Sequence, residues 1–334
     1  MESKSHMAWD AQLQELGGHL LQSWRWGEFK RRSGWGVDRI VTPDGSAMAQ
    51  VLYRTRGPLS VGYIPRGPAH SESGEGLPEL AALVERAAKQ RRSLFAVLEQ
   101  NAPFPAGATG FDKWIAGPDY VQPGRTVKVR LTDDETMLQR MHQKTRYSVR
   151  LAMRKGVQIE SFEGLCADGL AMFYALLTET SERNQFGVHS ETYYRDFLDV
   201  FGKDSLIMIA RVNGEPAAGL IAAKFGDEAI YMYGGSSTEH RSVGAAFLVQ
   251  FEAMRWARER GANSYDLWGI PHQDIPAETE VLDAVPATRG DDWRGLLRFK
   301  MGFAGDVIDY PRPIERQFSR IGTRLARQYL RTLG

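Results

Sequence analysis

Leu206-Ile-Met-Ile-Ala-Arg-Val212 is a mostly apolar stretch that turns at Asn213-Gly214 into a second one, Ala217–Phe225. An Asn-Gly pair between two such stretches is a strong hairpin signal, because both residues tolerate the positive φ angles of a tight turn. A third stretch, Ala229–Tyr233, has the composition of a further strand. The sequence therefore predicts an antiparallel hairpin followed by another strand.

A helix is predicted next, over residues 243–260, because large apolar residues recur there at helical spacing. These residues are Phe247, Leu248, Phe251 and Met254. Gly261 ends the helix, and Ser264–Trp268 is expected to form one more strand. The second half of the chain thus has the order hairpin, strand, helix, strand.

The first half repeats this order. Residues 37–64 alternate between apolar and polar around Pro43-Asp44-Gly45, which predicts a hairpin. A helix with Pro78 in its first turn follows, and then a buried strand, Leu94–Leu98. Hairpin, strand, helix, strand, twice over, is the order of the acyltransferase fold of GCN5-related N-acetyltransferases (GNAT). We expect an α/β (α+β) protein with two tandem domains of this type, each a mixed twisted sheet flanked by helices.

Composition narrows the classes of function. The 334 residues suit two domains, and 42 basic residues nearly cancel 41 acidic ones, so a nucleic acid would have to be bound by local patches. The single cysteine, Cys166, excludes an intramolecular disulfide and is interpreted as a small buried residue. No apolar run reaches the roughly 18 residues of a membrane span, and the N-terminus lacks the apolar core of a signal peptide. We expect a cytoplasmic protein.

Two segments carry arginines at helical spacing. A long helix is predicted from Asp133 or Asp134 to Gly156, and another over residues 312–334. Each has a basic stripe without matching acidic residues; the candidates for RNA contact are Arg146, Arg150, Arg154, Arg316, Arg320 and Arg324. Such stripes are either solvated faces or surfaces for a polyanion. A membrane-surface role for the last helix is a weaker alternative.

The sequence contains no HExxH, paired CxxC, Walker or GxSxG motif, and its seven histidines are scattered. We therefore expect neither a metal site nor a cofactor. The segment Arg241–Ala246 fits the pattern with which acetyltransferases hold the pyrophosphate of coenzyme A at a helix N-terminus. We favour the other interpretation, in which Gly244 allows close packing of a helix on the sheet.

The segment Gly295-Leu-Leu-Arg-Phe-Lys-Met-Gly-Phe303 places Lys300 between two phenylalanines. A lysine in aromatic surroundings is desolvated, and its charge then acts more strongly than in water. Such a lysine could stabilise negative charge that develops in a reaction. The alternative is a surface lysine between two core phenylalanines.

The chain resembles the FemABX family of peptidoglycan bridge-forming aminoacyltransferases along nearly its whole length. The matching segments are, in order, Leu20–Trp24 with Trp26–Lys30, Tyr63–Pro68, Val121–Pro123, Lys144–Arg150 with Arg154–Val157, Tyr231–Gly235, Tyr265–Ile270 and Gly295–Phe303. Since no long heptad pair occurs, the chain is similar to the members without a helical arm. The resemblance implies two tandem domains, residues 1–147 with a returning C-terminal helix at 311–334, and residues 148–310.

The resemblance also implies an activity and its partners. Members of the family carry an amino acid from aminoacyl-tRNA to an amine on the stem peptide of a cell-wall precursor. The acceptor is a soluble UDP-linked muropeptide or lipid II. We accordingly expect a cytoplasmic enzyme that works as a monomer, with peripheral contact to the inner face of the membrane as an open option.

Roles for single residues follow from the family motifs. Lys300 would stabilise the oxyanion of the tetrahedral intermediate, and Phe299 would stack on the terminal adenine of the tRNA. Lys30 would hold the diphosphate of the acceptor, and Tyr193 and Tyr233 would be further acceptor-binding groups.

One position departs from the family pattern. Where soluble-precursor enzymes have an arginine and a threonine, this chain has His189 and Gly187. A mostly neutral histidine cannot grip a phosphate in bidentate fashion, so the acceptor is held differently or is the lipid-linked form. Glu99 is the nearest acidic candidate for a base, and we assign no protein base.

Two other functions compete with this one. The first is a coenzyme A-dependent N-acyltransferase that uses Arg241–Ala246, and the second is a catalytically silent protein that binds tRNA or a muropeptide. The sequence leaves open which amino acid is transferred, which stem residue accepts it, and the oligomeric state.

Overall fold

The computed structural model describes residues 2–271 and 294–324. The chain divides into two units, the first comprising the residues up to Gln122 and those from Tyr310 on, the second comprising Pro123–Asp309. Residues 123–147, which the sequence analysis assigned to the first domain, lie in the second unit. The reason is that Val127 and Val129 of strand β7 (Arg125–Arg130) belong to its core.

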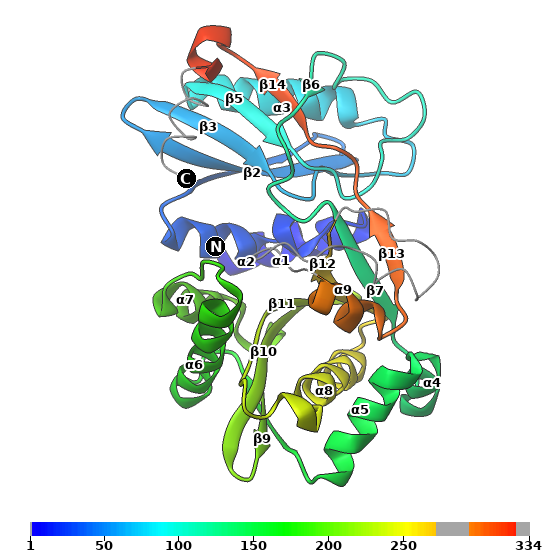
Figure 1. The fold of residues 1–334 in the computed structure, drawn as a ribbon. Helices are drawn as coiled ribbons and strands as arrows, with labels where there is room; N and C mark the ends of the chain where they lie inside the picture. Colours follow the sequence, from blue (N-terminus) through cyan, green and yellow to red (C-terminus); the bar gives the residue numbers. More distant parts are fainter. Residues whose placement is uncertain (1, 272–293, 325–334) are drawn as a thin grey trace. The chain divides into compact units, whose positions relative to one another are not determined.

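The first unit is built on a sheet with the strand order β1–β2–β3–β5–β14–β6, and β4 pairs with β2 (Figure 1). Its strands are β1 (Gly36–Val41), β2 (Ala47–Arg56), β3 (Leu59–Ile64), β4 (Ala69–His70), β5 (Ser93–Leu98), β6 (Ile115–Ala116) and β14 (Ile314–Gln317). Its helices are α1 (Glu2–Glu15), η1 (Leu20–Gln22), α2 (Trp24–Arg32) and α3 (Leu77–Gln90). β1, β2 and β3 are antiparallel neighbours and β3 runs parallel to β5, as the hairpin–strand–helix–strand order predicts.

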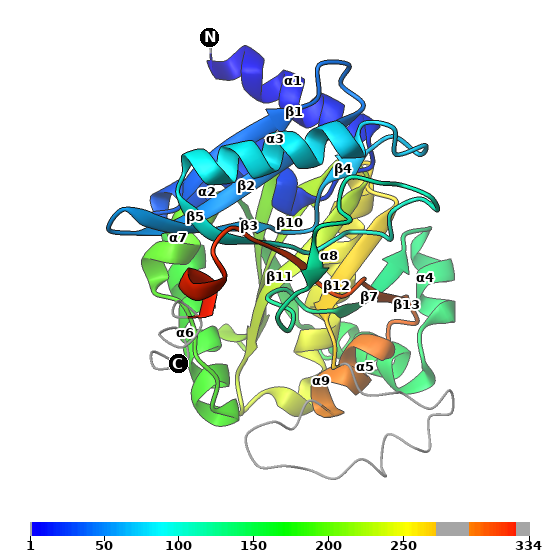
Figure 2. The same ribbon diagram turned by 90° about the horizontal axis from the view of Figure 1, so that it is seen from above.

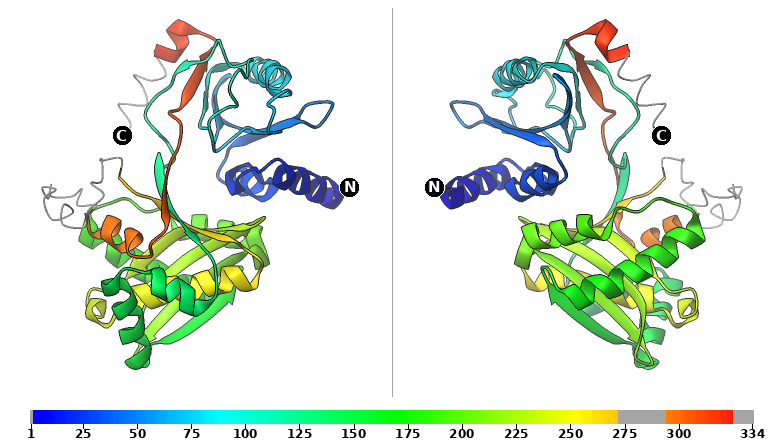
Figure 3. Two further views of the ribbon diagram at one scale, coloured as in Figure 1. Left: turned by 90° about the vertical axis from the view of Figure 1, so that its right-hand side faces the viewer. Right: turned by 90° about the vertical axis from the view of Figure 1, so that its left-hand side faces the viewer.

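Helices cover both faces of this sheet. α3 has Pro78 in its first turn and buries Leu80 and Val84 against one face of β2, where Ala49 and Val51 lie (Figure 2). Each such side chain contributes about 1.5–3 kcal/mol when it leaves water. The α1 and α2 helices lie on the opposite side (Figure 3). There the side chain of Gln50 donates to the Ser23 carbonyl at 3.0 Å.

The second unit has a sheet with the order β13–β7–β12–β11–β10–β9–β8. Its further strands are β8 (Gln158–Glu163), β9 (Ser205–Val212), β10 (Glu215–Phe225), β11 (Glu228–Ser236), β12 (Ser264–Gly269) and β13 (Asp306–Asp309). Its helices are α4 (Asp134–Arg140), α5 (Gln143–Arg154), α6 (Ala167–Asn184), α7 (Glu191–Phe201), η2 (Gly202–Asp204), η3 (Arg241–Val243), α8 (Ala245–Glu259) and α9 (Arg294–Met301). The predicted hairpin, third strand, helix and fourth strand are β9–β10, β11, α8 and β12.

This sheet also has helices on both faces, with α5 and α8 on one side and α6 and α7 on the other (Figure 1). Leu220 of β10 belongs to the core that contains Leu248 and Phe251 of α8. The neighbouring Gly219 faces α6, because a Cβ atom there would lie 3.3 Å from the side chain of Leu176. Alternation along the strand thus supplies two cores, one on each face.

The single long helix predicted from Asp133 to Gly156 is wrong, because the segment forms two helices, α4 and α5. Met141 and His142 separate them with extended ψ angles of 145° and 146°. The Arg146 side chain donates to the carbonyls of Gln139 at 2.8 Å and Met141 at 3.2 Å. A tertiary contact therefore satisfies the carbonyls at the end of α4, which a continuous helix would have paired internally.

The helix predicted over residues 312–334 is also corrected, because Ile314–Gln317 form β14. This strand pairs antiparallel with β5 on one side and β6 on the other. Pro311 and Pro313 favour an extended chain before it. Helical structure begins only at Arg320, and the side chain of Ile321 in this helix is 77% exposed. Residues 325–334 of the prediction lie outside the described residues.

Candidate active site

Two parallel strands of the second unit part from each other in the middle of the sheet. β11 pairs with β12 through Glu228–Ile230 and Ser264–Asp266. Both strands are described over their full length, and the pairing stops there although β11 continues to Ser236 and β12 to Gly269. The ends of the two strands therefore have backbone groups available for other partners.

A β-bulge in β11 divides its tyrosines between the two faces of the sheet. Ile221 of β10 is opposite Tyr233 and the next residue, Ala222, is opposite Tyr231, so Met232 is the extra residue. Tyr231 packs against the core that contains α8, whereas Tyr233 contacts Tyr194 of α7, with ring centroids 4.9 Å apart. Two residues of the same type, two positions apart, thus serve different sites.

Lys300 of α9 lies where β11 and β12 part. Its Nζ donates to the carbonyl of Gly269 at 2.7 Å and is 5.6 Å from the ring centroid of Tyr231. The side chain is only 4% exposed. Burial lowers the pKa of Lys300 from 10.5 to about 7, and the negative charge of Asp266 opposes that effect. Lys300 is thus a fixed amine that exchanges its proton near neutral pH.

Phe299 is part of an aromatic cluster beside this lysine. Its ring centroid is 4.9 Å from that of Phe247 on α8 and 5.4 Å from that of Phe303. Phe303 is 1% exposed, while Phe299 is only partly buried. Lys300 is desolvated, as predicted, although the ring contact described for its Nζ is with Tyr231 and not with Phe299 or Phe303. The Phe299 ring keeps an accessible part for stacking.

His189, Tyr193 and Tyr233 form a second cluster on the α6–α7 face. The His189 ring stacks on Tyr193 with centroids 3.9 Å apart, and Tyr193 and Tyr233 are 6.4 Å apart. Burial raises the pKa values of both tyrosines above 10, so their hydroxyls stay protonated at neutral pH. The structure thus brings together three of the residues predicted to bind the acceptor.

Lys30 belongs to the first unit, in the last turn of α2. Its Nζ lies 4.5 Å from the ring centroid of Trp26 and 4.7 Å from that of Phe29. Burial, together with the positive charge of Arg54, lowers the pKa of Lys30 to about 8. The aromatic rings fix the direction of this ammonium, which remains mostly charged at neutral pH.

The six arginines predicted to contact RNA differ in what they do. Arg146 is occupied with the end of α4, and Arg316 pairs with Glu85 of α3 at 2.7 Å. The others are exposed: Arg150, Arg154, Arg320 and Arg324. On α5, Arg154 lies 5.8 Å from the ring centroid of Tyr147, which is 58% exposed. The outer face of α5 therefore combines positive charge with an exposed aromatic ring.

Glu99, the acidic candidate, serves the structure of the first unit. Its carboxylate accepts hydrogen bonds from the Tyr63 hydroxyl and from the backbone N–H groups of Val121, at 2.6 Å, and Gln122, at 3.2 Å. The residue is fully buried. With three donors already directed at it, this carboxylate is built as an anchor for the Val121–Gln122 segment.

The helix start at Arg241–Ala246 supports the packing interpretation. Gly244 has φ +84° and precedes α8, and a Cβ atom there would lie 2.5 Å from the backbone oxygen of Ser148 on α5. Glycine is needed because α5 comes this close to the start of α8.

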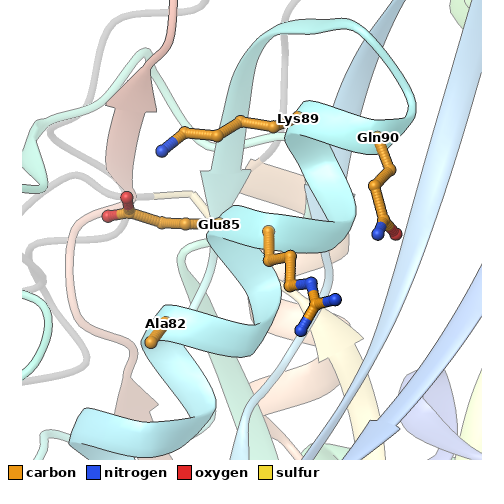
Figure 4. A pocket seen from close by; sticks show the side chains of 5 residues that line it. Ala82, Glu85, Lys89 and Gln90 are labelled. Atoms are coloured by element: carbon orange, nitrogen blue, oxygen red, sulfur yellow. The ribbon is translucent and has the colours of Figure 1, made fainter.

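A shallow depression lies on the outer face of α3 and is lined by Ala82, Glu85, Arg86, Lys89 and Gln90 (Figure 4). All five residues belong to one helix, and Glu85 is already paired with Arg316. The depression has none of the predicted site residues, so we do not assign it a function.

Three residues at the lysine site carried no role in the sequence analysis: Tyr231, Asp266 and Gly269. All lie in segments that resemble the family, yet Tyr231 looks like a core strand residue and Gly269 like a strand end. Their participation depends on the bulges and on where the strands part, which a single sequence does not show.

The two units, each with the order hairpin, strand, helix, strand, define a tandem acyltransferase fold. The sequence model of the FemAB family matches residues 110–215 and 213–312. The chain belongs to the FemAB family, and it is an aminoacyltransferase.

Individual relatives agree with this assignment. The lipid II:glycine glycyltransferase of Staphylococcus epidermidis is 23% identical over 379 residues, covering 88% of this chain and 89% of that protein. Its counterpart from Staphylococcus aureus strain USA300 is 24% identical over 382 residues with the same coverage. The crystal structure of FemX superimposes with a TM-score of 0.82 at 19% identity, covering 96% of this chain and 98% of that one.

A more distant structural neighbour is the C-terminal domain of a putative lysylphosphatidylglycerol synthetase from Agrobacterium fabrum. Its TM-score is 0.57 at 16% identity, with 93% of this chain and 92% of that chain covered.

Within residues 2–271 and 294–324, none of the helices has both the length and the apolar character needed to cross a membrane.

Proposed function

We propose that this protein transfers an amino acid from an aminoacyl-tRNA to the stem-peptide amine of a peptidoglycan precursor, with lipid II as the acceptor, in the formation of interpeptide bridges. The names of the two staphylococcal relatives support the lipid-linked acceptor. The observation that carries the chemistry is Lys300, a buried amine held by a backbone carbonyl where β11 and β12 part.

In this reaction the acceptor amine attacks the ester carbonyl that joins the amino acid to the tRNA ribose. A C–N bond forms, and the carbonyl oxygen becomes an oxyanion in the tetrahedral intermediate. When the intermediate collapses, the ester C–O bond breaks and the departing ribose oxygen takes up a proton from the amine. The products are an amide and a tRNA with a free hydroxyl.

The Lys300 ammonium is proposed to donate a hydrogen bond to the oxyanion. A preorganised donor of this kind contributes about 2.7–4 kcal/mol, which corresponds to roughly a hundredfold to a thousandfold in rate. The low exposure of Lys300 strengthens the interaction, because little water competes for the charge. With a pKa of about 7, a large fraction of the amine is protonated at neutral pH.

Binding roles are proposed for the remaining candidates. Phe299 would stack on the terminal adenine of the tRNA, since its ring is partly accessible. Lys30 would contact the acceptor diphosphate, and His189, Tyr193 and Tyr233 would contact other parts of the acceptor as hydrogen-bonding groups. The exposed arginines of α5 and of residues 320–324 would contact tRNA phosphates. Because aminoacyl-tRNA is a cytoplasmic substrate, the protein is proposed to act on the cytoplasmic side of the membrane.

The coenzyme A-dependent alternative has less support. Its candidate phosphate cradle, Arg241–Ala246, contains Gly244, where the absence of a side chain is explained by the close approach of Ser148. The solved tandem GNAT protein from clavulanic acid biosynthesis has a TM-score of 0.50 at 11% identity, over 85% of this chain and 83% of that one, which bears on the fold alone.

Three incubations test the proposal. The protein is mixed with labelled aminoacyl-tRNA and lipid II, with the same donor and a UDP-linked muropeptide, and with labelled acetyl-CoA and each acceptor. We expect transfer from aminoacyl-tRNA, with lipid II the better acceptor. Transfer from acetyl-CoA alone would establish the alternative enzyme, and RNA binding without consumption of either donor would establish a silent binding protein.

A further inference from the structure

Strand β12, whose Gly269 carbonyl accepts from Lys300, contains a β-bulge of its own. β12 pairs with β7 through Asp266 and Lys128, and then through Gly269 and Thr126. Leu267 and Trp268 of β12 are thus opposite a single residue of β7. Trp268 has φ +61°, an unusual conformation for a bulky residue. The bulge therefore needs a local interaction that stabilises it.

Asp266 supplies that interaction. Its Oδ1 accepts the Trp268 backbone N–H at 2.6 Å and also accepts the hydroxyl of Thr126 on β7. A carboxylate that binds the N–H two residues ahead mimics a backbone turn. The side chain thereby replaces the strand pairing that the bulge interrupts, and it fixes the conformation of Trp268.

The bulge at Trp268 directly precedes the carbonyl that holds Lys300. Gly269 follows Trp268 directly, and its carbonyl accepts from the Lys300 Nζ at 2.7 Å. Two hydrogen bonds and one peptide unit thus connect the Asp266 carboxylate to the proposed catalytic amine. The Gly269 carbonyl belongs to the Gly269–Ile270 peptide, whose N–H donates to the Arg125 carbonyl of β7 at 3.0 Å. The pairing with β7 and the bulge at Trp268 therefore fix this acceptor together.

Asp266 is also a buried charge near the same amine. It is 0% exposed, and the Lys128 Nζ lies 4.0 Å from its Oδ2 and 2.6 Å from Glu228 of β11. The charged and titratable groups that the second unit places around the site include Lys128 on β7, Glu228 and Tyr231 on β11, Tyr265 and Asp266 on β12, and Lys300 on α9. The negative charge of Asp266 raises the pKa of Lys300, against the effect of burial.

We propose that Asp266 is a positioning residue for Lys300, which helps to fix the Gly269 carbonyl through the bulge at Trp268. The electrostatic part of its effect is the negative charge of its carboxylate, which favours the charged form of the amine. This inference rests on the proposed function, in which Lys300 acts on the reacting ester. The competing interpretation is that Asp266 has a structural role only, in which it joins β12 to β7 through the hydroxyl of Thr126.

Two variants separate the geometric part from the electrostatic part. Asp266→Asn keeps an oxygen that can accept from Trp268 but removes the charge, whereas Asp266→Ala removes both. We expect Asp266→Ala to lower kcat by roughly tenfold or more, as neighbours in one network do, with little change in KM. Asp266→Asn should recover part of that loss. Asp306→Asn, on an exposed strand position of the same unit, is the matched control.

A double-mutant cycle with Lys300→Met decides between the two interpretations. If Asp266 acts through Lys300, Asp266→Ala adds no further loss to the low rate of Lys300→Met. If Asp266→Ala lowers the rate by the same factor in both backgrounds, the residue has a structural role only and the inference is overturned.

A readout that needs no turnover keeps this test apart from the proposed function. The reactivity of the Lys300 amine toward a small amine-modifying reagent, followed by mass spectrometry across pH, reports its titration directly. We expect the midpoint to move to lower pH in Asp266→Asn and to stay unchanged in Asp306→Asn. An unchanged midpoint in Asp266→Asn would contradict the electrostatic part even if wild type transfers amino acids. A shifted midpoint in a protein that transfers none would leave the link intact and remove the proposed function.

Discussion

The two units share one order of strands, yet their parallel strand pairs differ. In the first unit β3 and β5 stay paired to Ile64 and Leu98, and the ladder continues with Glu99 donating its N–H to Ile64 at 3.0 Å. In the second unit the equivalent pair, β11 and β12, ends at Ile230 and Asp266. The parallel strands of the first unit thus stay paired to their ends, whereas those of the second unit separate. The buried Lys300 lies where they separate.

The buried charged groups of the units reflect this difference. Glu99 in the first unit receives three protein donors and anchors a chain segment. Lys300 in the second unit donates to one carbonyl, that of Gly269, and an ammonium has three N–H groups. Under the proposed function, Glu99 therefore serves the stability of the first unit, whereas Lys300 serves the reaction.

The largest expected effect comes from Lys300→Met. If this variant kept the wild-type rate, the contrast between Lys300 and Glu99 would be wrong. We expect kcat for transfer to fall by roughly a hundredfold to a thousandfold, as for loss of one oxyanion donor. Acceptor affinity should stay nearly unchanged, and the folded protein should be at least as stable, because a desolvated amine is removed. Single-turnover kinetics over a range of acceptor concentrations give the rate and the acceptor affinity, and thermal unfolding gives the stability. Lys89→Met on the exposed face of α3 is the control, and a mainly KM effect in Lys300→Met would mean that Lys300 binds substrate instead.

The counterpart in the first unit is Glu99→Gln, which should change stability instead of chemistry. The amide cannot accept from all three donors, and its NH₂ group faces N–H groups. We expect the free energy of unfolding to fall by about 1–3 kcal/mol, in the range for a buried donor left unsatisfied. Urea unfolding measures this, with Glu72→Gln in an exposed loop as control. A loss of transfer rate per folded molecule, with stability unchanged, would show that Glu99 takes part in the reaction.

Gly244→Ala probes the packing of the second unit. The φ of +84° alone costs about 1–2 kcal/mol for an L-residue, and the added Cβ would also meet the Ser148 oxygen. Gly214→Ala is the matched control, because it has φ +88° and open space around its Cβ position. We expect Gly244→Ala to lower the free energy of unfolding more than the control does. Equal effects would mean that α5 yields easily and that close packing does not explain this glycine.

The smallest expected effect concerns RNA. Arg150→Glu and Arg154→Glu should each weaken tRNA binding severalfold and reduce the slope of log Kd against log salt by about one. Arg86→Glu on α3, an exposed arginine of the first unit, is the control. Filter binding at several salt concentrations gives the slopes. If all three variants behave alike, the outer face of α5 has no special part in tRNA binding.

The regular elements of both units could be predicted because their signals are local. Asn213-Gly214 indicated the β9–β10 hairpin, and apolar spacing indicated α8 and α3. β14 could not be found this way, because its four residues form a strand only through β5 and β6 on either side. The break between α4 and α5 depends likewise on the Arg146 side chain, which comes from the following helix.

The residues of the candidate site likewise fall into those that the sequence could predict and those that it could not. Lys300 and Phe299 could be named from a lysine among aromatic residues together with the family resemblance. Asp266 and Gly269 could not, because their contribution depends on a bulge that exists only in the paired sheet. The separation of Tyr231 from Tyr233 has the same origin, since a regular strand would place both on one face.

The pH dependence of the Lys300 contribution tests the central claim most directly. Single-turnover rates of wild type and Lys300→Met are measured from about pH 6 to about pH 9, and their ratio is taken so that titration of the acceptor amine cancels. Because the account requires the ammonium form, and burial holds the pKa of Lys300 at about 7, the ratio should be largest at low pH and fall as the pH rises through about 7. A ratio that stays constant, or that increases with pH, would contradict an oxyanion-stabilising Lys300.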